Sequence, residues 1–138
     1  EILGVIGPSG AGKSTLARAL VGAQIPTAGT IRVDGANIAD WDADDLGAHL
    51  GYLPQDSVLF AGTIGENICR FSADPEAGKG VVPAAQVAGA HEMIQRFPQG
   101  YNSMLGLRGE GVSAGQAQRV ALARALVTAV STSCSCAA

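Results

Sequence analysis

The stretch Gly7–Thr15 reads GPSGAGKST and lies between an apolar run at Ile2–Ile6 and a helical pattern at Lys13–Val21. Its glycines let the backbone turn sharply, so that successive N–H groups point at one anion. The helix that begins near Lys13 adds the positive end of its dipole, and the lysine adds a full charge. The stretch matches the pattern G-x-x-x-x-G-K-S in full. We therefore predict that a strand, this loop and a helix together bind the phosphates of a nucleotide.

The residues of this phosphate loop have distinct predicted roles. Lys13 can reach the β- and γ-phosphates, and the Ser14 hydroxyl can ligate Mg²⁺. The alternative is a glycine-rich turn that binds nothing, but the strand before it and the helix after it favour a nucleotide. The predicted phosphate-binding residues are Gly7, Ser9, Gly10, Ala11, Gly12, Lys13, Ser14 and Thr15.

Composition restricts the possible partners of the chain. It has 138 residues, a formal net charge of −3 and 47% hydrophobic residues, so a packed core is feasible and general nucleic-acid binding is not expected. No segment approaches the ~20 apolar residues of a membrane span, and no signal peptide is evident. With three cysteines, one of them Cys69, a disulfide framework is not expected. A metal at Cys134 and Cys136 is the less favoured alternative to an incidental pair.

Local patterns predict strands and helices in the first 61 residues and mainly helices after them. The predicted strands are Ile2–Ile6, Gly29–Val33 and Gly51–Leu53, with a tight turn at Asp34-Gly35. The predicted helices are Lys13–Val21 with Gly22 as its C-cap, Asp42–Leu50 with Asp42 as its N-cap, Gly65–Phe71, Val82–Phe97 and Gln116–Val127. Val87, Ala90, Ile94 and Phe97 are expected on one buried face.

Gln55 follows the predicted strand Gly51–Leu53, in the run GYLPQDSVLFAGTIGENI. Its carboxamide can ligate the same Mg²⁺ and position a water, although a solvent-exposed loop glutamine is the alternative. Residues 1–127 resemble the nucleotide-binding domain of ABC transporters, and this run looks like the Q-loop region of the exporter branch. With PTAGTIRVDGANIADWD before it and HEMIQRFPQGYN after it, the chain is most similar to the ATPase half of type I protein-secretion exporters.

The resemblance implies an α/β fold, namely an incomplete P-loop NTPase (ABC ATPase) core with the helical signature subdomain. Its implied parts are 1–61 from P-loop to Q-loop, 62–112 as the helical subdomain and 113–127 as the signature helix. The implied cofactors are ATP and Mg²⁺, the latter held by Ser14 and Gln55. By the same resemblance, Asp56–Glu66 would contact a transmembrane permease domain at the cytoplasmic face of the membrane.

The sequence Val112-Ser113-Ala114-Gly115-Gln116 stands where the family has its signature motif, usually Leu-Ser-Gly-Gly-Gln. A serine hydroxyl and backbone N–H groups at a helix start suit an anion. The resemblance implies that this anion is the γ-phosphate bound by a second nucleotide-binding domain in a head-to-tail dimer. The alternative is that Ser113 is an N-cap of the helix and binds no ligand; Ser113 can also serve as N-cap and anion donor at once. We expect Ala114, in place of glycine, to weaken the site by crowding the phosphate or by resisting a positive φ.

Several features of the family have no match in this sequence. A Walker B strand ending in Asp-Glu is absent, and neither His49 nor His91 matches the switch histidine. Nor do Trp41 and Tyr52 match the aromatic residue that stacks on adenine. We therefore expect the chain to begin and end inside the domain and to be marginally stable. Residues 128–138 are expected to be a non-native or disordered tail; the hypothesis of a shifted reading frame, which permits Tyr-Gly after Val127, is tested by the coding DNA.

Three functions remain open from the sequence. The first is the ATPase domain of an ABC exporter, which couples hydrolysis to transport. The second is a truncated, hydrolysis-deficient ATP-binding remnant. The third, a different P-loop enzyme such as a small-molecule kinase, is disfavoured by the contexts of Gln55 and Ser113. ATP turnover compared with Lys13→Ala separates the first two.

Overall fold

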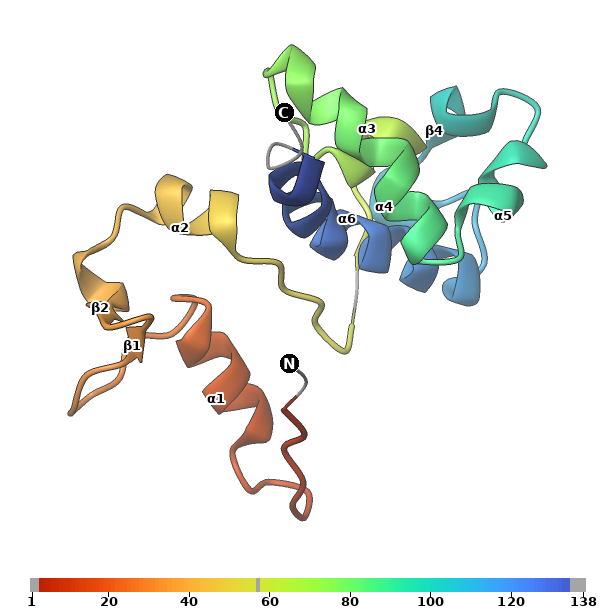
Figure 1. Cartoon of the computed structure of the whole chain (residues 1–138). Helices are drawn as coiled ribbons and strands as arrows, with labels where there is room; N and C mark the ends of the chain where they lie inside the picture. The colour runs from red at the N-terminus through yellow and green to blue at the C-terminus, as the bar shows by residue number, and fades with distance from the viewer. Residues whose placement is uncertain (1–2, 57, 135–138) are drawn as a thin grey trace. The chain divides into compact units, whose positions relative to one another are not determined.

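The computed structural model describes residues 3–56 and 58–134, and the chain divides into two compact units, 1–50 and 51–138 (Figure 1). Each unit is described by itself. The first contains the phosphate loop, and the second contains Gln55 and the signature motif. In the part of the chain that is described, no helix is long and apolar enough to cross a membrane.

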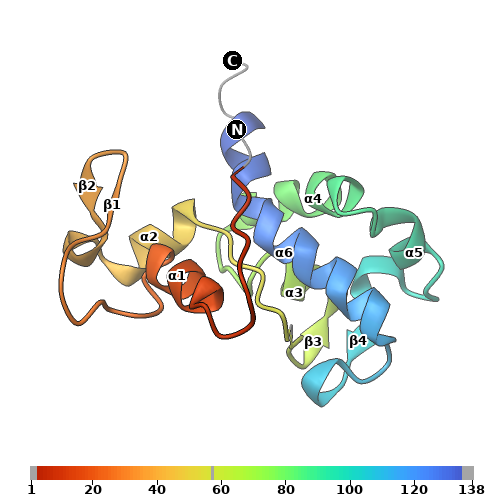
Figure 2. The ribbon, with the colours of Figure 1, turned by 90° about the horizontal axis from the view of Figure 1, so that it is seen from below.

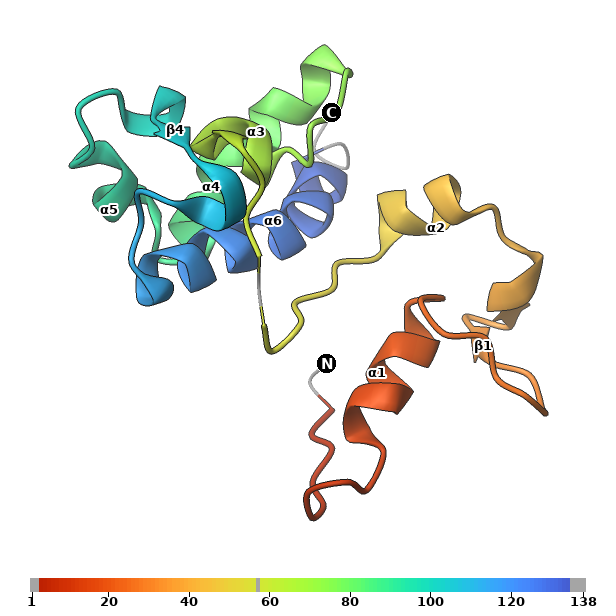
Figure 3. The same cartoon turned by 180° about the vertical axis from the view of Figure 1, so that it is seen from behind.

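The first unit combines short helices with one hairpin (Figure 3). Its elements are α1 (Lys13–Leu20), β1 (Arg32–Val33), β2 (Ala36–Asn37), a 3-10 turn at Ile38–Asp40 and α2 (Ala43–His49). β1 and β2 pair antiparallel, with Arg32 opposite Asn37. The predicted turn between them is confirmed: Asp34 has φ 49° and Gly35 has φ 83°, the two left-handed residues that suit a tight hairpin.

The end of α1 matches the prediction. Gly22 has φ +73° and donates its N–H to the carbonyl of Ala19, while Ala23 donates to Arg18. This pair of bonds is the Schellman arrangement, which satisfies carbonyls that the last helical turn leaves without partners. The predicted N-cap of α2 is also confirmed, because the Asp42 side chain accepts a bond from the N–H of Asp44 at 2.9 Å.

The strands expected around the phosphate loop are the main difference. Residues 3–6 of the predicted strand Ile2–Ile6 have no regular structure, and Ile6 is 97% exposed. Gly29–Val33 is a strand only at Arg32–Val33, and Gly51–Leu53 is not a strand. A buried parallel strand needs neighbours on both sides, and within residues 3–56 and 58–134 the only ladders are two short antiparallel pairs.

The second unit is largely helical (Figure 2). Its helices are α3 (Ile64–Ile68), α4 (Val81–Val87), α5 (His91–Gln95) and α6 (Ala114–Cys134), and its strands are β3 (Gly62–Thr63) and β4 (Met104–Leu105). Short 3-10 turns lie at Pro75–Gly80, Gly100–Asn102 and Leu107–Gly109. β3 pairs antiparallel with β4. α6 packs against α3 and α4.

The core of this second unit is aliphatic and is centred on α6. α6 contributes Val120, Ala121, Ala123 and Val127, all at most 5% exposed. Small alanines there let α4 approach closely, and Ile64, Ile68 and Ile94 fill the remaining space.

Three predicted helical segments are corrected by the structure. The predicted helix Gly65–Phe71 ends at Ile68, because Arg70 and Phe71 adopt φ 61° and 56°. Val82–Phe97 is not one helix, because Gly89 adopts φ +64° and separates α4 from α5. This break leaves Val87 69% exposed, whereas Ala90 and Ile94 are buried as expected. α6 extends beyond Val127 to Cys134, so part of the expected tail is helical; residues 135–138, and with them Cys136, lie outside the described residues.

Candidate functional site

The phosphate loop closes on itself through its lysine. The Lys13 ammonium donates to the carbonyls of Gly7 and Pro8, both at 2.7 Å. Gly10 and Gly12 have φ +81° and +86°, a backbone conformation that glycine adopts at little cost. Within the loop, the N–H of Ala11 donates to the carbonyl of Pro8 at 3.2 Å. The loop is therefore a compact turn that the Lys13 side chain closes by binding the carbonyls at its start.

The loop has room for a phosphate group. Gly12 is the N-cap of α1 and supplies no side chain, and the first turn of α1 contains no acidic residue. A Cβ at Gly10 or Gly12 would meet nothing within 4 Å, so the surface above the backbone is open. The dipole of α1 and the charge of Lys13 therefore favour an anion at this position. Ser9, Ser14 and Thr15 are exposed beside it.

The oxygen donors predicted for Mg²⁺ suit that ion. Ser14 offers a hydroxyl in the first unit, and Gln55 offers a carboxamide in the second. Both side chains are exposed, and both present the hard oxygen atoms that Mg²⁺ prefers. Among the residues that the structure describes, no cluster of three or more His, Cys, Asp or Glu side chains forms a separate metal site.

A buried asparagine holds the segment that follows Gln55. Asn67 is 0% exposed, and its Oδ1 accepts from the N–H of Phe60 at 2.8 Å. Its Nδ2 donates to the carbonyls of Phe60 and Thr63 at 2.9 and 3.0 Å. The amide thus replaces strand-like partners for the backbone of Phe60, which fixes the direction of the chain before α3.

One arginine of α6 contacts the same segment, and a second arginine binds the main chain of the first. Arg124 donates from Nη1 to the carbonyl of Val58 at 3.1 Å, and its guanidinium lies 5.6 Å from the centre of the Phe60 ring. Arg70 donates from Nε to the carbonyl of Arg124 at 3.2 Å. Burial lowers the pKa of Arg124; burial and then the charge of Arg124 lower the pKa of Arg70. Phe60 itself remains 58% exposed.

The signature motif forms a reciprocal cap at the start of α6. The Ser113 N–H donates to Oε1 of Gln116 at 2.7 Å, and the Gln116 N–H donates to Oγ of Ser113 at 3.3 Å. This is a capping box, which does not engage the N–H groups of Ala114 and Gly115. Ser113, Ala114 and Gly115 are all exposed. Val112 packs against the core and fixes the approach to the helix.

One expected weakness of the motif is wrong. Ala114 is the first residue of α6 and is not among the described residues with positive φ, so its Cβ causes no backbone strain. The other expected weakness, crowding of a phosphate by that Cβ, stays a prediction. A Cβ at Gly115 would meet nothing within 4 Å, which leaves the adjacent position open.

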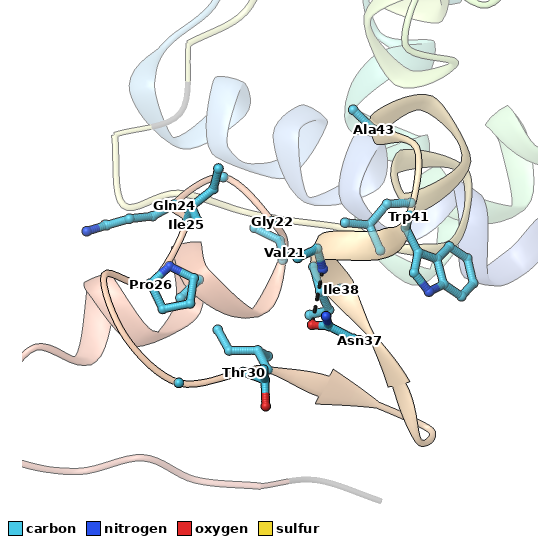
Figure 4. A pocket seen from close by; sticks show the side chains of 16 residues that line it. Val21, Gly22, Gln24, Ile25, Pro26, Thr30, Asn37, Ile38, Trp41 and Ala43 are labelled. Carbon is cyan, nitrogen blue, oxygen red and sulfur yellow. Dashed lines mark hydrogen bonds between the residues drawn. The ribbon is translucent and has the colours of Figure 1, made fainter.

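An apolar pocket in the first unit lies at the other end of α1 from the phosphate loop (Figure 4). Val21, Ile25, Pro26, Ile38 and Trp41 contribute to its wall, and its lining includes none of Gly7–Thr15. No residue that lines it has a titratable side chain. Among the described residues, the lining of this pocket provides no acid or base. The candidate site residues remain those of the phosphate loop in the first unit and, separately, Gln55 and the signature motif in the second.

Sequence reasoning missed three side chains that support these motifs, and it missed the capping role of Gln116 within the signature motif. Arg70 and Arg124 act through partners 54 and 66 positions away in sequence, for which no local signal exists. Asn67 bonds the nearby main chain of Phe60 and Thr63, but no recognised local motif predicts these contacts. Gln116 could have been recognised, because Ser-x-x-Gln before a helix is the pattern of a capping box. The same pattern, Thr-x-x-Glu, occurs at Thr63 and Glu66, where the structure shows both reciprocal bonds.

Comparisons with known proteins identify the family of the chain. A family model described as ABC transporter matches residues 1–132. The type I secretion system ATP-binding protein PrsD of Rhizobium meliloti (strain 1021) is 54% identical over 124 residues, which cover 90% of this chain and 21% of that protein. ATP-binding cassette sub-family B member 6 of Homo sapiens is 43% identical over 129 residues, which cover 94% of this chain and 15% of that protein.

A solved structure gives the same result. The structure of a bacterial Atm1-family ABC exporter with ATP bound has a TM-score of 0.75 and 47% identity, and the match covers 88% of this chain and 21% of that one. The fold is that of a P-loop ATPase core with a helical subdomain, as predicted. The chain belongs to the ABC transporter family. It spans between 15% and 21% of the length of these two curated relatives.

Proposed function

We propose that the chain is the ATP-binding domain of an ABC exporter, in which ATP hydrolysis is coupled to transport across a membrane. The observation that carries the proposal is the phosphate loop. Lys13 binds the carbonyls of Gly7 and Pro8, and no side chain caps the start of α1. Lys13 would release its loop carbonyls to bind the β- and γ-phosphates. Bound Mg²⁺, held by Ser14 and Gln55, would neutralise phosphate charge.

The signature motif supplies the second half of the proposed ATP site. The Ser113 hydroxyl and the N–H groups of Ala114 and Gly115, all in exposed residues, would donate to an anion from outside the subunit. A second copy in head-to-tail orientation would place its own ATP there. The partner for the segment Asp56–Glu66, in which Asp56, Val58 and Phe60 are exposed, would be a transmembrane permease domain. The chain would then lie at the cytoplasmic face of the membrane.

Type I protein secretion is the transport process that we favour, because PrsD is described as a type I secretion ATP-binding protein. The similarity to proteins described as Atm1-type exporters makes heavy-metal export the competing substrate class. A transport assay of the full-length parent, with a secreted protein and with a metal complex as cargo, separates the two.

A binding-only role is the second candidate for this chain. The sequence has no acidic residue after Glu110, so it supplies no carboxylates of the Walker B kind behind α6. Without a general base, the barrier to hydrolysis rises by several kcal/mol.

The deciding experiment measures MgATP turnover of the chain and of Lys13→Ala. Rapid turnover that depends on Lys13 supports the hydrolytic role and excludes the binding-only role. Binding without turnover selects the binding-only role, and failure to bind ATP contradicts both.

A further inference from the structure

The segment that contains Gln55 is held by α6 at both of its ends. Before Gln55, the backbone of Gly51 lies directly on α6, because a Cβ at this position would collide with the carbonyl oxygen of Ala125. After Gln55, Arg124 donates to the carbonyl of Val58 and lies against the Phe60 ring. Two consecutive residues of α6 therefore bracket the segment.

The Arg124 side chain makes these contacts with a geometry that lysine cannot reproduce. A guanidinium is planar, so it can donate a hydrogen bond in its plane while its face lies on an aromatic ring. The main chain at Arg124 is held in turn by Arg70, whose Nε donates to its carbonyl at 3.2 Å. The bond to Val58 spans 66 positions in sequence, so it joins the segment after Gln55 to the distant helix α6.

We infer that Arg124 is a positioning residue for Gln55, holding the Gln55 segment on the helix whose first turn carries the signature motif. The inference rests on the proposed function, in which Gln55 ligates the Mg²⁺ of bound ATP. Groups that orient a metal ligand commonly change metal affinity by about 10- to 100-fold when they are removed. Arg124 thereby links two motifs of one subunit: the metal ligand for its own ATP and the donors offered to the ATP of a second copy.

The test is a titration of the full chain with ATP, with and without Mg²⁺, in the wild type and three variants. Arg124→Met removes both the charge and the planar guanidinium, and Arg124→Lys keeps only the charge. Arg119→Met is the matched control at an exposed position of α6. Both Arg124 variants should keep the metal-free ATP affinity within about twofold and lose about tenfold or more of the Mg²⁺-dependent gain. Arg119→Met should keep both.

A second readout needs no nucleotide. Hydrogen exchange of the amides at 58–60 should accelerate in Arg124→Met, while amides of α4 keep the wild-type rate. Faster exchange throughout the second unit would instead show a general loss of folding and would overturn the positioning role, as would unchanged exchange at 58–60.

The remaining outcomes are also decisive. Full Mg²⁺-dependent gain in either Arg124 variant, or an equal loss with and without Mg²⁺, overturns the inference. Wild-type chain that binds ATP through Lys13 without any gain from Mg²⁺ overturns it too, while the ATP-binding proposal stands. Absence of Lys13-dependent ATP binding in the wild type contradicts the proposed function itself.

Discussion

Asn67 shows how one side chain determines the course of the backbone near the candidate site. All three of its hydrogen bonds go to the main chain of Phe60 and Thr63, and the side chain is fully buried. Truncation would therefore leave two carbonyls and one N–H without these bonds in a partly buried environment. Unsatisfied buried groups of this kind cost about 1–3 kcal/mol each, less where water can enter.

We predict that Asn67→Ala lowers the free energy of unfolding by about 2–4 kcal/mol. Asn67→Asp should also destabilise the chain at neutral pH, because its second oxygen would face two carbonyl oxygens. Urea unfolding followed by circular dichroism measures both, with the exposed Asn102→Ala as the control. Equal stability of the Asn67 and Asn102 variants would contradict the role assigned to Asn67.

At the scale of elements, the C-terminus of α1 depends on one glycine. Gly22 has φ +73°, and a Cβ there would lie 2.7 Å from Cδ2 of Leu46, one of the two buried side chains described in the first unit. Gly22→Ala should cost about 1–2 kcal/mol for the left-handed backbone alone, plus the displacement of Leu46. Gly47→Ala, in the interior of α2 with open space around it, should instead stabilise by about 0.5–1 kcal/mol.

Thermal unfolding of the first unit, followed by hydrogen exchange at Ala23 and Leu46, compares the two alanine variants. Opposite shifts are expected for Gly22→Ala and Gly47→Ala. If both variants shift stability in the same direction, the cap does not depend on the conformation of Gly22.

The capping box of α3 has a predicted pH dependence. Hydrogen bonds from the Thr63 backbone, and then from its hydroxyl, lower the pKa of Glu66. Because the folded-state pKa is depressed, this contact stabilises above the ordinary pKa of glutamate, and the contribution is lost as the pH falls through the folded value. The melting temperature of the wild type should therefore fall toward that of Glu66→Gln between about pH 5 and pH 3. Glu92→Gln, at another exposed glutamate, is the control; a pH-independent difference for Glu66→Gln would contradict the assignment.

Elements that depend on local signals were predictable from the sequence. Gly22, Asp42 and the turn at Asp34-Gly35 each act within a few residues of their own position, and all three are confirmed. The family and its α/β P-loop core were likewise predicted from motifs and are confirmed.

Non-local structure was not predictable in the same way. The apolar run at Ile2–Ile6 reads as a strand, but strand formation depends on partners that its own residues do not specify. The break at Gly89 was missed because helical periodicity continues across it. The contacts of Arg124 with Val58 and Phe60 have no counterpart in a local pattern.

At the scale of the whole molecule, the two units differ in how much apolar surface they bury. In the described part of the first unit, only Ile38 and Leu46 are buried, and Leu3 is 88% exposed. The second unit has a contiguous aliphatic core around α6. Burial of apolar surface is the main favourable term in folding, so the two units should differ in stability.

We predict that native-state hydrogen exchange protects amides of α4 and α6 at least tenfold more strongly than those of α1 and α2, a difference of about 1.4 kcal/mol or more. The chain should also show the marginal stability expected from the sequence. A single cooperative melt of soluble monomer, with equal protection in both units, would contradict this prediction.

The central claim is that Gly7–Thr15 binds the phosphates of ATP, and equilibrium binding of MgATP to the full chain tests it most directly. Lys13→Ala should weaken binding by about 10- to 100-fold, since a hydrogen bond to a charged group contributes about 1.5–3 kcal/mol. Lys79→Ala removes a surface lysine that pairs with Glu76 in the second unit and should leave the dissociation constant unchanged. Equal affinities of the wild type and Lys13→Ala would contradict the claim.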